Sequence, residues 1–303
     1  MNDSYRAISE EYVKWVDTLG FSNHLVHNCR RNIRVFLDWL ESREIGSIDK
    51  LTDKHIIQYF NYSETRSNMN VKNRLLSAAH LNKIFYTVDK FLEFLHQNGM
   101  ENAPVPVNRR MEINQQERIL KIETFTQQEI KTLYDTIPET YPNLTFVHRQ
   151  AVHYEIKLYF ALFYGCGLRR SEGFNLQIQN IDFDKKTVFV EQGKNYKDRI
   201  VPMSAGVYRD LQDYVYNYRH RLKLNHNRLL TTVQAQYNIR LKHLQNTCQD
   251  KNIRAKRLSV HVLRHSIATH LLQNGMSIEN IALFLGHSSL DSTQIYTHII
   301  NEI

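Results

Sequence analysis

The chain has 303 residues, long enough for two domains that each bury a hydrophobic core. Its hydrophobic fraction of 42% and charged fraction of 23% are those of an ordinary soluble globular protein, and its formal net charge of +8 favours a polyanionic partner. No stretch approaches the roughly 18 uncharged apolar residues of a membrane span. The first residues also lack a signal-peptide pattern, so we expect a cytoplasmic protein without a membrane partner.

The first hundred residues show helical periodicity throughout. Apolar residues follow helical spacing over residues 8–19 and again over 29–40. Thr52 is suited to cap a short helix over residues 52–59, and a longer apolar stripe covers residues 81–95. The pattern predicts a compact four-helix domain over residues 1–103.

The pattern changes after residue 103. Pro104 and Pro106 remove backbone donors and favour an extended chain, so residues 104–123 are expected to form an interdomain linker. Thr126 and Glu129 have the spacing of a capping box, which marks the place where helices resume.

The second domain, residues 124–303, has a mixed pattern. An apolar helix is expected over residues 151–164, followed by three strands over 180–183, 187–191 and 199–203. From Val207 onward the pattern is helical to the end. The sequence thus predicts a mainly α fold with a small antiparallel β-sheet, in which a helical domain precedes an α+β domain.

The positive charge is concentrated in the second domain. Residues 1–104 carry 13 basic and 13 acidic side chains, whereas residues 105–303 carry 26 and 18. Residues 219–257 include ten basic side chains and one acid, Asp250. Such a run is often a solvated surface, but its place just before His261 favours an electropositive groove.

The three cysteines, Cys29, Cys166 and Cys248, are odd in number and widely spaced. They match neither a disulfide framework nor a zinc ligand set. We therefore expect buried thiols.

Two arginines stand in places that suit phosphate chemistry. Arg169 follows the apolar helix and the glycines of residues 165–167, where an unpaired charge is costly. Arg264 closes a His-x-x-Arg pattern that begins at His261. A guanidinium presents a planar fork of donors, so two of them can stabilise the extra charge of a pentavalent phosphorus transition state. Glu172, one turn after Arg169, is placed to hold that guanidinium.

The histidines near the C-terminus raise the question of a metal site. His261 and His265 have the spacing of zinc-binding helices, but Val262 stands where a general-base glutamate would be and no third ligand is nearby. We therefore expect no metal. We expect these histidines to donate a hydrogen bond to a phosphate or to accept a proton. For His265 and His270 the alternative is that they pack in the core. His287 follows a turn that would present it at a helix end.

Tyr296 is the candidate nucleophile. Most of the 17 tyrosines in the chain are expected to pack, but a tyrosyl oxygen can attack phosphorus and form a covalent phosphotyrosine. A free phenol has a pKa of about 10, so it needs adjacent cationic groups to become reactive.

Together these motifs resemble the tyrosine recombinase (phage integrase) family, in particular its short Xer-like and transposon-integrase members. The resemblance covers nearly the whole chain and implies a SAM-like, four-helix core-binding domain, a linker and a catalytic domain. It implies that Tyr296 is the nucleophile and that Lys194 protonates the leaving 5′ oxygen, with Lys197 as a weaker alternative. The remaining catalytic residues implied are Arg169, His261, Arg264 and His287, with Glu172 in support.

The resemblance further implies a site-specific DNA recombinase that cleaves and exchanges strands through a 3′-phosphotyrosine, without a cofactor. One partner would be double-stranded DNA, clamped between the two domains. The others would be three further copies of this chain, which form a homotetramer on two DNA sites. An accessory directionality factor and association with the nucleoid belong to the same expectation. The basic residues that we expect at the DNA are Arg30, Arg31, Arg34, Lys72, Arg74, Arg254, Lys256 and Arg257.

Several alternatives stay open. The role could be integration or excision of a mobile element, transposition, or resolution of chromosome dimers. Two other classes are a DNA-binding accessory factor without catalysis and a relaxing topoisomerase that also forms a 3′-phosphotyrosine. Only seven residues follow Tyr296, where many family members extend a helix into a neighbouring subunit, so we expect the subunits to interlock differently.

Overall fold

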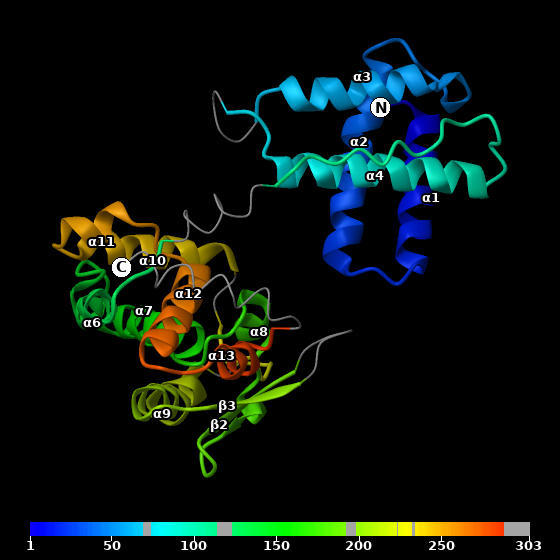
Figure 1. The fold of residues 1–303 in the computed structure, drawn as a ribbon. Helices are drawn as coiled ribbons and strands as arrows, with labels where there is room; N and C mark the ends of the chain where they lie inside the picture. Colours follow the sequence, from blue (N-terminus) through cyan, green and yellow to red (C-terminus); the bar gives the residue numbers. More distant parts are fainter. Residues whose placement is uncertain (69–73, 114–122, 192–197, 223, 232–233, 288–303) are drawn as a thin grey trace. The chain divides into compact units, whose positions relative to one another are not determined.

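The computed structural model describes the chain except for residues 69–73, 114–122, 192–197, 223, 232–233 and 288–303 (Figure 1). Contacts between Cα atoms divide it into two compact units, Met1–Asn114 and Gln115–Ile303. Among the described helices, none combines the length and the apolar character that a bilayer crossing needs.

The first unit is helical, as its periodicity predicts. Its four main helices bury aromatic and aliphatic side chains in one core, and the hydroxyl of Tyr12 donates to the carbonyl of Thr87 inside it. Thr52 is the N-cap of the third helix, as predicted. The elements are α1 (Asp3–Thr18), α2 (Asn23–Glu41), the 3₁₀ turn η1 (Ile48–Lys50), α3 (Asp53–Thr65) and α4 (Ala78–Gln97).

The first half of the expected linker packs on this unit. The backbone N–H groups of Val107 and Met111 donate to the side chains of Asp89 and Asn82 on α4. Side chains of α4 thus satisfy these backbone donors of the extended chain.

The second unit is mostly helical around one core. Its helices α12 and α13 enclose a smaller apolar cluster that includes Ala268 and Ile281. The elements before the sheet are α6 (Gln127–Asp135), the 3₁₀ turn η2 (Ile137–Glu139), α7 (Phe146–Tyr159), the π-helical turn η3 (Phe160–Gly165), α8 (Arg170–Asn175) and the 3₁₀ turn η4 (Ile178–Asn180). Those after it are α9 (Ala205–Gln212), the π-helical turn η5 (Asp213–Tyr218), the 3₁₀ turn η6 (Arg219–Leu222), α10 (Gln234–Thr247), α11 (Lys251–Ala255), α12 (Val260–Gln273) and α13 (Ile278–Leu285).

The sheet has three antiparallel strands in the order β1 (Ile181–Asp182), β2 (Thr187–Val190) and β3 (Arg199–Pro202). Val190 pairs with Arg199, and Phe189 with Ile200. The second pair is exposed, so the first pair belongs to the inner face of the hairpin.

Two sequence expectations differ from the structure. The helix expected over residues 151–164 is α-helical only to Tyr159 and then widens into η3. The continuous helical pattern expected after Val207 is also wrong, because residues 224–231 are not helical. Arg228 instead forms a β-bridge with Gln177, because Leu229 and Leu230 must reach the core there. The three cysteines are buried, as predicted.

Candidate active site

The end of α13 forms the centre of the candidate site. Gly286 ends the helix in the left-handed conformation, with φ of 68° and ψ of 46°. The N–H of His287 donates to the carbonyl of Ala282 at 2.9 Å, and that of Gly286 to Leu283 at 3.1 Å, which is a Schellman motif. This cap places His287 directly after the helix end, as its sequence predicts.

Three successive carbonyl oxygens at this end each accept a hydrogen bond from a different arginine. A helix C-terminus leaves its last carbonyls without intrahelical partners and carries partial negative charge, so it attracts cations. Arg199 Nε donates to Phe284 at 3.0 Å, Arg264 Nη2 donates to Leu285 at 2.9 Å, and Arg169 Nη2 donates to Gly286.

Glu172 joins the same arginines from the other side. Its carboxylate accepts two hydrogen bonds from Arg199, at 3.1 and 2.8 Å, and one from Arg169 Nη1 at 2.8 Å. It also accepts the backbone N–H of Arg169 at 2.8 Å, which caps α8. Burial alone would raise the pKa of Glu172, but the contacts with Arg199 and Arg169 outweigh it and lower that pKa to about 2. Glu172 is therefore a carboxylate at neutral pH.

Arg264 is buried, with 7% of its side chain exposed. Its Nη1 donates to the carbonyl of Gly167 and lies 4.0 Å from Glu172. Arg169 is more open, with 30% of its side chain exposed. The structure thus brings together Arg169, Glu172, Arg264 and His287, which lie as many as 118 positions apart in the chain.

Arg199 is a member of this cluster that the sequence analysis missed. The sequence pattern predicts it only as the start of a strand, whereas in the structure it pairs with Val190 on the inner face of the hairpin. A basic residue at an inward strand position must find a buried partner, and that signal was present in the strand alternation.

His261 lies in the first turn of α12. Ser259 is the N-cap of this helix, and its hydroxyl accepts the N–H of Val262 at 3.3 Å. Burial lowers the pKa of His261, and the charges of Arg170, Arg264 and Arg257 lower it further. The N-terminal end of a helix attracts anions, so His261 stands where a phosphate would be favoured.

His265 and His287 are held neutral. Burial is the main cause, and neighbouring positive groups add to it, so the pKa of each is lowered to about 4. The expectation that His261, His265 and His270 share one helix is confirmed by α12. The structure adds that the hydroxyl of Tyr164 and Nδ1 of buried His270 are 2.9 Å apart. His270 therefore packs, which was the alternative weighed for it.

Three predicted site residues lie outside the described residues: Tyr296, Lys194 and Lys72. Lys197 lies outside them as well.

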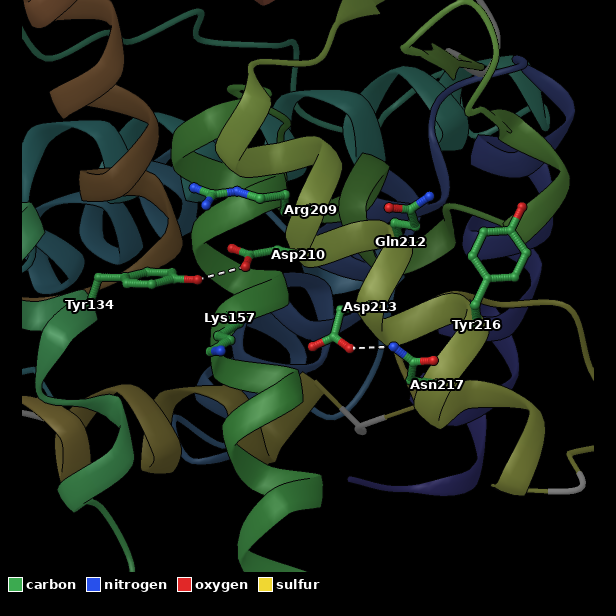
Figure 2. A pocket seen from close by; sticks show the side chains of 8 residues that line it. All are labelled: Tyr134, Lys157, Arg209, Asp210, Gln212, Asp213, Tyr216 and Asn217. Atoms are coloured by element: carbon green, nitrogen blue, oxygen red, sulfur yellow. Dashed lines mark hydrogen bonds between the residues drawn. The ribbon is translucent and has the colours of Figure 1, made fainter.

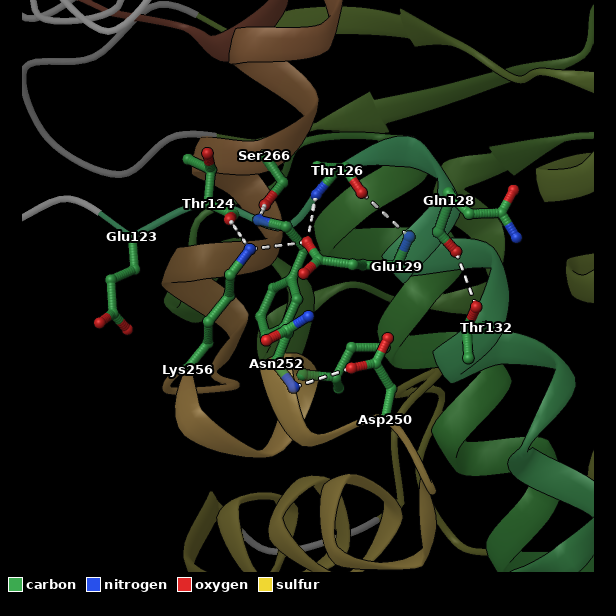
Figure 3. A network of polar contacts seen from close by, with 12 residues as sticks. Glu123, Thr124, Thr126, Gln128, Glu129, Thr132, Asp250, Asn252, Lys256 and Ser266 are labelled. Atoms are coloured by element: carbon green, nitrogen blue, oxygen red, sulfur yellow. Dashed lines mark hydrogen bonds and ion pairs between the residues drawn. The ribbon is translucent and has the colours of Figure 1, made fainter. Parts of the chain in front are cut away.

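The basic residues expected at the DNA differ in their surroundings. Lys256 Nζ donates to Glu129 at 2.7 Å and to the carbonyl of Thr124 at 3.0 Å, and it lies over the ring of Phe125 (Figure 3). Ser266 on α12 accepts the N–H of Phe125 in the same network. Lys256 thus holds the segment that precedes α12 against α6 and against the chain that enters this unit.

Other members of the basic run 219–257 are also used within the unit. Arg219 donates to the carbonyls of His226 and Arg228. Arg240 pairs with Glu155, and Arg254 Nε donates to the carbonyl of Cys248. The positive surface of this run is therefore smaller than its composition indicates. Among the described residues of this run, the exposed basic ones are Arg221, Arg228, Lys242, Lys251, Arg254 and Arg257.

The helical unit has a basic cavity of its own, with a volume of about 920 Å³. Two of the predicted DNA contacts, Arg31 and Arg74, line it, together with Arg66 and His80. Burial and then the charges of Arg31, Arg66 and Lys83 lower the pKa of His80. The other two described candidates, Arg30 and Arg34, are exposed on α2.

A polar cavity of about 630 Å³ on the second unit is separate from the arginine cluster (Figure 2). Its acids have internal partners: Asp210 accepts from the hydroxyl of Tyr134 at 2.6 Å, and Asp213 accepts from Asn217 at 2.7 Å. It shares no lining residue with the cluster, so we assign it no part in the chemistry.

The chain is similar to known proteins in sequence and in fold. Residues 123–302 match the model of the phage integrase family. The tyrosine recombinase XerC of Oceanobacillus iheyensis is 30% identical over 290 residues, which cover 93% of this chain and 87% of that protein. The tyrosine recombinase XerD of Staphylococcus saprophyticus is 28% identical over 299 residues, with coverage of 96% and 94%.

Solved structures show the same fold. The XerH site-specific recombinase bound to its difH substrate has a TM-score of 0.68 at 16% identity, covering 91% of this chain and 78% of that one. The Tn1549 transposon integrase in complex with circular intermediate DNA has a TM-score of 0.67 at 17% identity, covering 95% and 94%. The family model spans more than half of the chain and whole-length relatives carry the same assignment, so the chain belongs to the phage integrase family, as a tyrosine site-specific recombinase of the Xer type.

Proposed function

We propose that the chain cleaves and rejoins DNA strands through a covalent 3′-phosphotyrosine at Tyr296. The phenol oxygen attacks the scissile phosphorus and gives its proton to water, the phosphorus–5′ oxygen bond breaks, and the leaving oxygen takes a proton from Lys194. The 5′ hydroxyl of a second DNA then attacks the phosphotyrosine and returns a proton to Lys194, while the released tyrosine oxygen takes a proton from water and the strands are rejoined. Each step exchanges one phosphodiester for another, so no ATP is consumed.

The observation that carries this proposal is the convergence of Arg169 and Arg264 beside His287. Three positive or hydrogen-bonding groups at one helix end form a preorganised site for the charge of a pentavalent phosphate. Because Glu172 and the carbonyls of α13 already hold the two guanidiniums, little reorganisation is needed when the charge develops. His261, at the N-terminal end of α12, supplies a further donor.

The partner that fits these groups is double-stranded DNA. Related structures are complexes with DNA, namely XerH with difH and the Tn1549 integrase with a circular intermediate. We assign phosphate contacts in the second unit to Arg254 and Arg257, and in the helical unit to the cavity of Arg31 and Arg74. Arg30, Arg34 and Lys72 would extend the second set. Phosphate contacts of this kind give a steep dependence of affinity on salt.

Exchange between two duplexes requires two active sites on each DNA, so the assembly proposed is a homotetramer on two sites. The role proposed is integration or excision of a mobile element, or resolution of chromosome dimers at the nucleoid. An accessory factor that sets the direction of exchange would be compatible with either role.

The test uses a nicked suicide substrate, in which the cleaved fragment diffuses away and the covalent complex accumulates. Cleavage would first be mapped on DNA that flanks the gene of this protein. The wild-type chain is expected to form an SDS-resistant adduct with this DNA, and Tyr296→Phe is expected to bind the same DNA without forming it. An adduct formed by Tyr296→Phe would contradict the proposal.

The same reactions separate the two other classes. A DNA-binding accessory factor would bind the site and leave no adduct even with the wild-type chain. A relaxing topoisomerase would form the adduct and relax supercoiled plasmid without site preference or recombinant product. Recombinant product from a two-site plasmid therefore distinguishes the proposed function from both.

A further inference from the structure

Arg199 is a buried charge on the inner face of a strand. Its side chain is 8% exposed, while the neighbouring Ile200 points outward and is 66% exposed. Val201, the next residue on the inner face, is completely buried. An apolar side chain would be the ordinary choice at such a position, because a buried charge is costly unless it is paired.

The guanidinium of Arg199 joins three elements. It donates one hydrogen bond to each carboxylate oxygen of Glu172 on α8 and a third to the carbonyl of Phe284 at the end of α13. The backbone of Arg199 is meanwhile fixed in β3 by its pairing with Val190. Arg199 thereby links the sheet to Glu172 and to the end of α13, which also hold Arg169 and Arg264.

The same two features set the positions of the groups that we assign to the phosphate. Glu172 holds Arg169, and the carbonyls that follow Phe284 hold Arg264 and Arg169. If Arg199 were lost, Glu172 would lose two of its donors and the end of α13 would lose one. A displacement of about 1 Å at a reacting centre can cost about 10²-fold in rate.

We propose that Arg199 is a positioning residue: it fixes Glu172 and the end of α13, and thereby aims Arg169 and Arg264 at the scissile phosphate. This inference rests on the proposed function. Arg199 itself is turned toward the carboxylate and the carbonyl and takes no direct part in the reaction.

The experiment measures single-turnover cleavage on two suicide substrates, one with a normal phosphodiester and one with a methylphosphonate at the scissile position. The methylphosphonate lacks one negative charge, so its transition state depends less on well-aimed arginines. Arg199→Gln is expected to cleave the normal substrate about 10²-fold more slowly than wild type. On the methylphosphonate substrate the variant is expected to be less than about tenfold slower than wild type.

Two controls make the outcome specific. Arg209→Gln removes an exposed arginine of α9 and is expected to leave both rates unchanged. Lys194→Ala is expected to lose the same factor on both substrates, because its proposed role concerns the leaving oxygen. If Arg199→Gln does not fold, as a thermal melt would show, Arg199→Lys replaces it, since lysine keeps the charge but cannot make both contacts with Glu172.

An equal loss for the arginine variant on the two substrates, or no loss on either, would overturn this inference. A wild-type chain that forms no adduct on either substrate would instead overturn the proposed function. The two failures are therefore distinguishable.

Discussion

Arg169 donates a hydrogen bond to the carbonyl oxygen of Gly286, which lies 117 positions further along the chain and immediately precedes His287. This contact places the more exposed of the two arginines next to the histidine. The other terminal nitrogen of Arg169 donates to Glu172, so both terminal nitrogens of the guanidinium are needed to keep the two contacts.

The substitution Arg169→Lys is expected to slow covalent adduct formation by about 10²–10³-fold, the loss typical when one oxyanion donor is removed. An ammonium keeps the charge but cannot contact Glu172 and Gly286 together. DNA affinity, measured by gel shift, should change little. The matched control is Arg170→Lys at the exposed neighbouring position, which should cleave at the wild-type rate.

The substitution Glu172→Gln is expected to lower the free energy of unfolding by about 3–5 kcal/mol, because it leaves buried arginines without their carboxylate. Urea unfolding followed by circular dichroism measures this. Asp135→Asn, which removes an exposed carboxylate paired with the exposed Lys131, should leave the unfolding curve nearly unchanged. A variant at Glu172 as stable as the wild type would show that the carboxylate is not needed to hold the cluster.

Gly167 stands where no side chain fits. Its φ is +57°, and a Cβ there would lie 2.8 Å from Phe284 and 2.9 Å from Leu285. Gly167→Ala is therefore expected to push the end of α13 away, to lower stability by about 1–3 kcal/mol and to abolish most cleavage. Gly206→Ala is the control, since a Cβ at that position meets nothing within 4 Å. Normal cleavage by Gly167→Ala would show that the helix end tolerates the shift.

Lys256 and Arg257 are adjacent but should respond differently. Lys256→Met breaks the network of Figure 3 and is expected to lower stability by about 1.5–3 kcal/mol, the value of hydrogen bonds to charged groups. Arg257→Gln should leave stability unchanged and reduce the slope of log affinity against log salt by about 1. Equal salt slopes for wild type and Arg257→Gln would remove Arg257 from the DNA contacts.

Acidification is expected to destabilise the second unit. The pKa values of His265 and His287 are lowered to about 4, whereas an unfolded histidine titrates at about 6.5. Between these values the unfolded chain binds protons that the folded chain does not. The free energy of unfolding therefore falls as the pH falls from 6.5 toward 4.

Urea unfolding at pH 7, 6 and 5 measures this slope. His265→Gln should flatten it, whereas His220→Gln, at an exposed position, should not. Stability that stays constant from pH 7 to pH 5 would show that these histidines are not buried in their neutral form.

Much of this protein could be predicted from local patterns. The helical spacing of the first unit, the antiparallel hairpins and the position of His261 and Arg264 on one helix depend on residues close together in the chain. The turn at Gly286 and the capping role of Thr52 are equally local, because each follows from the conformational preference of one residue.

Only the tertiary structure decided which partners the charged side chains have. Lys256 and Arg257 are indistinguishable by composition, yet one is held by Glu129 and the other is exposed. Arg199 pairs with a carboxylate 27 positions earlier and with a carbonyl 85 positions later. Which charges meet depends on how α8, β3 and α13 pack, and packing is set by the whole core. The sequence by itself therefore predicted candidate reactive groups, whereas the folded chain decided which charged side chains hold Arg169 and Arg264 in place.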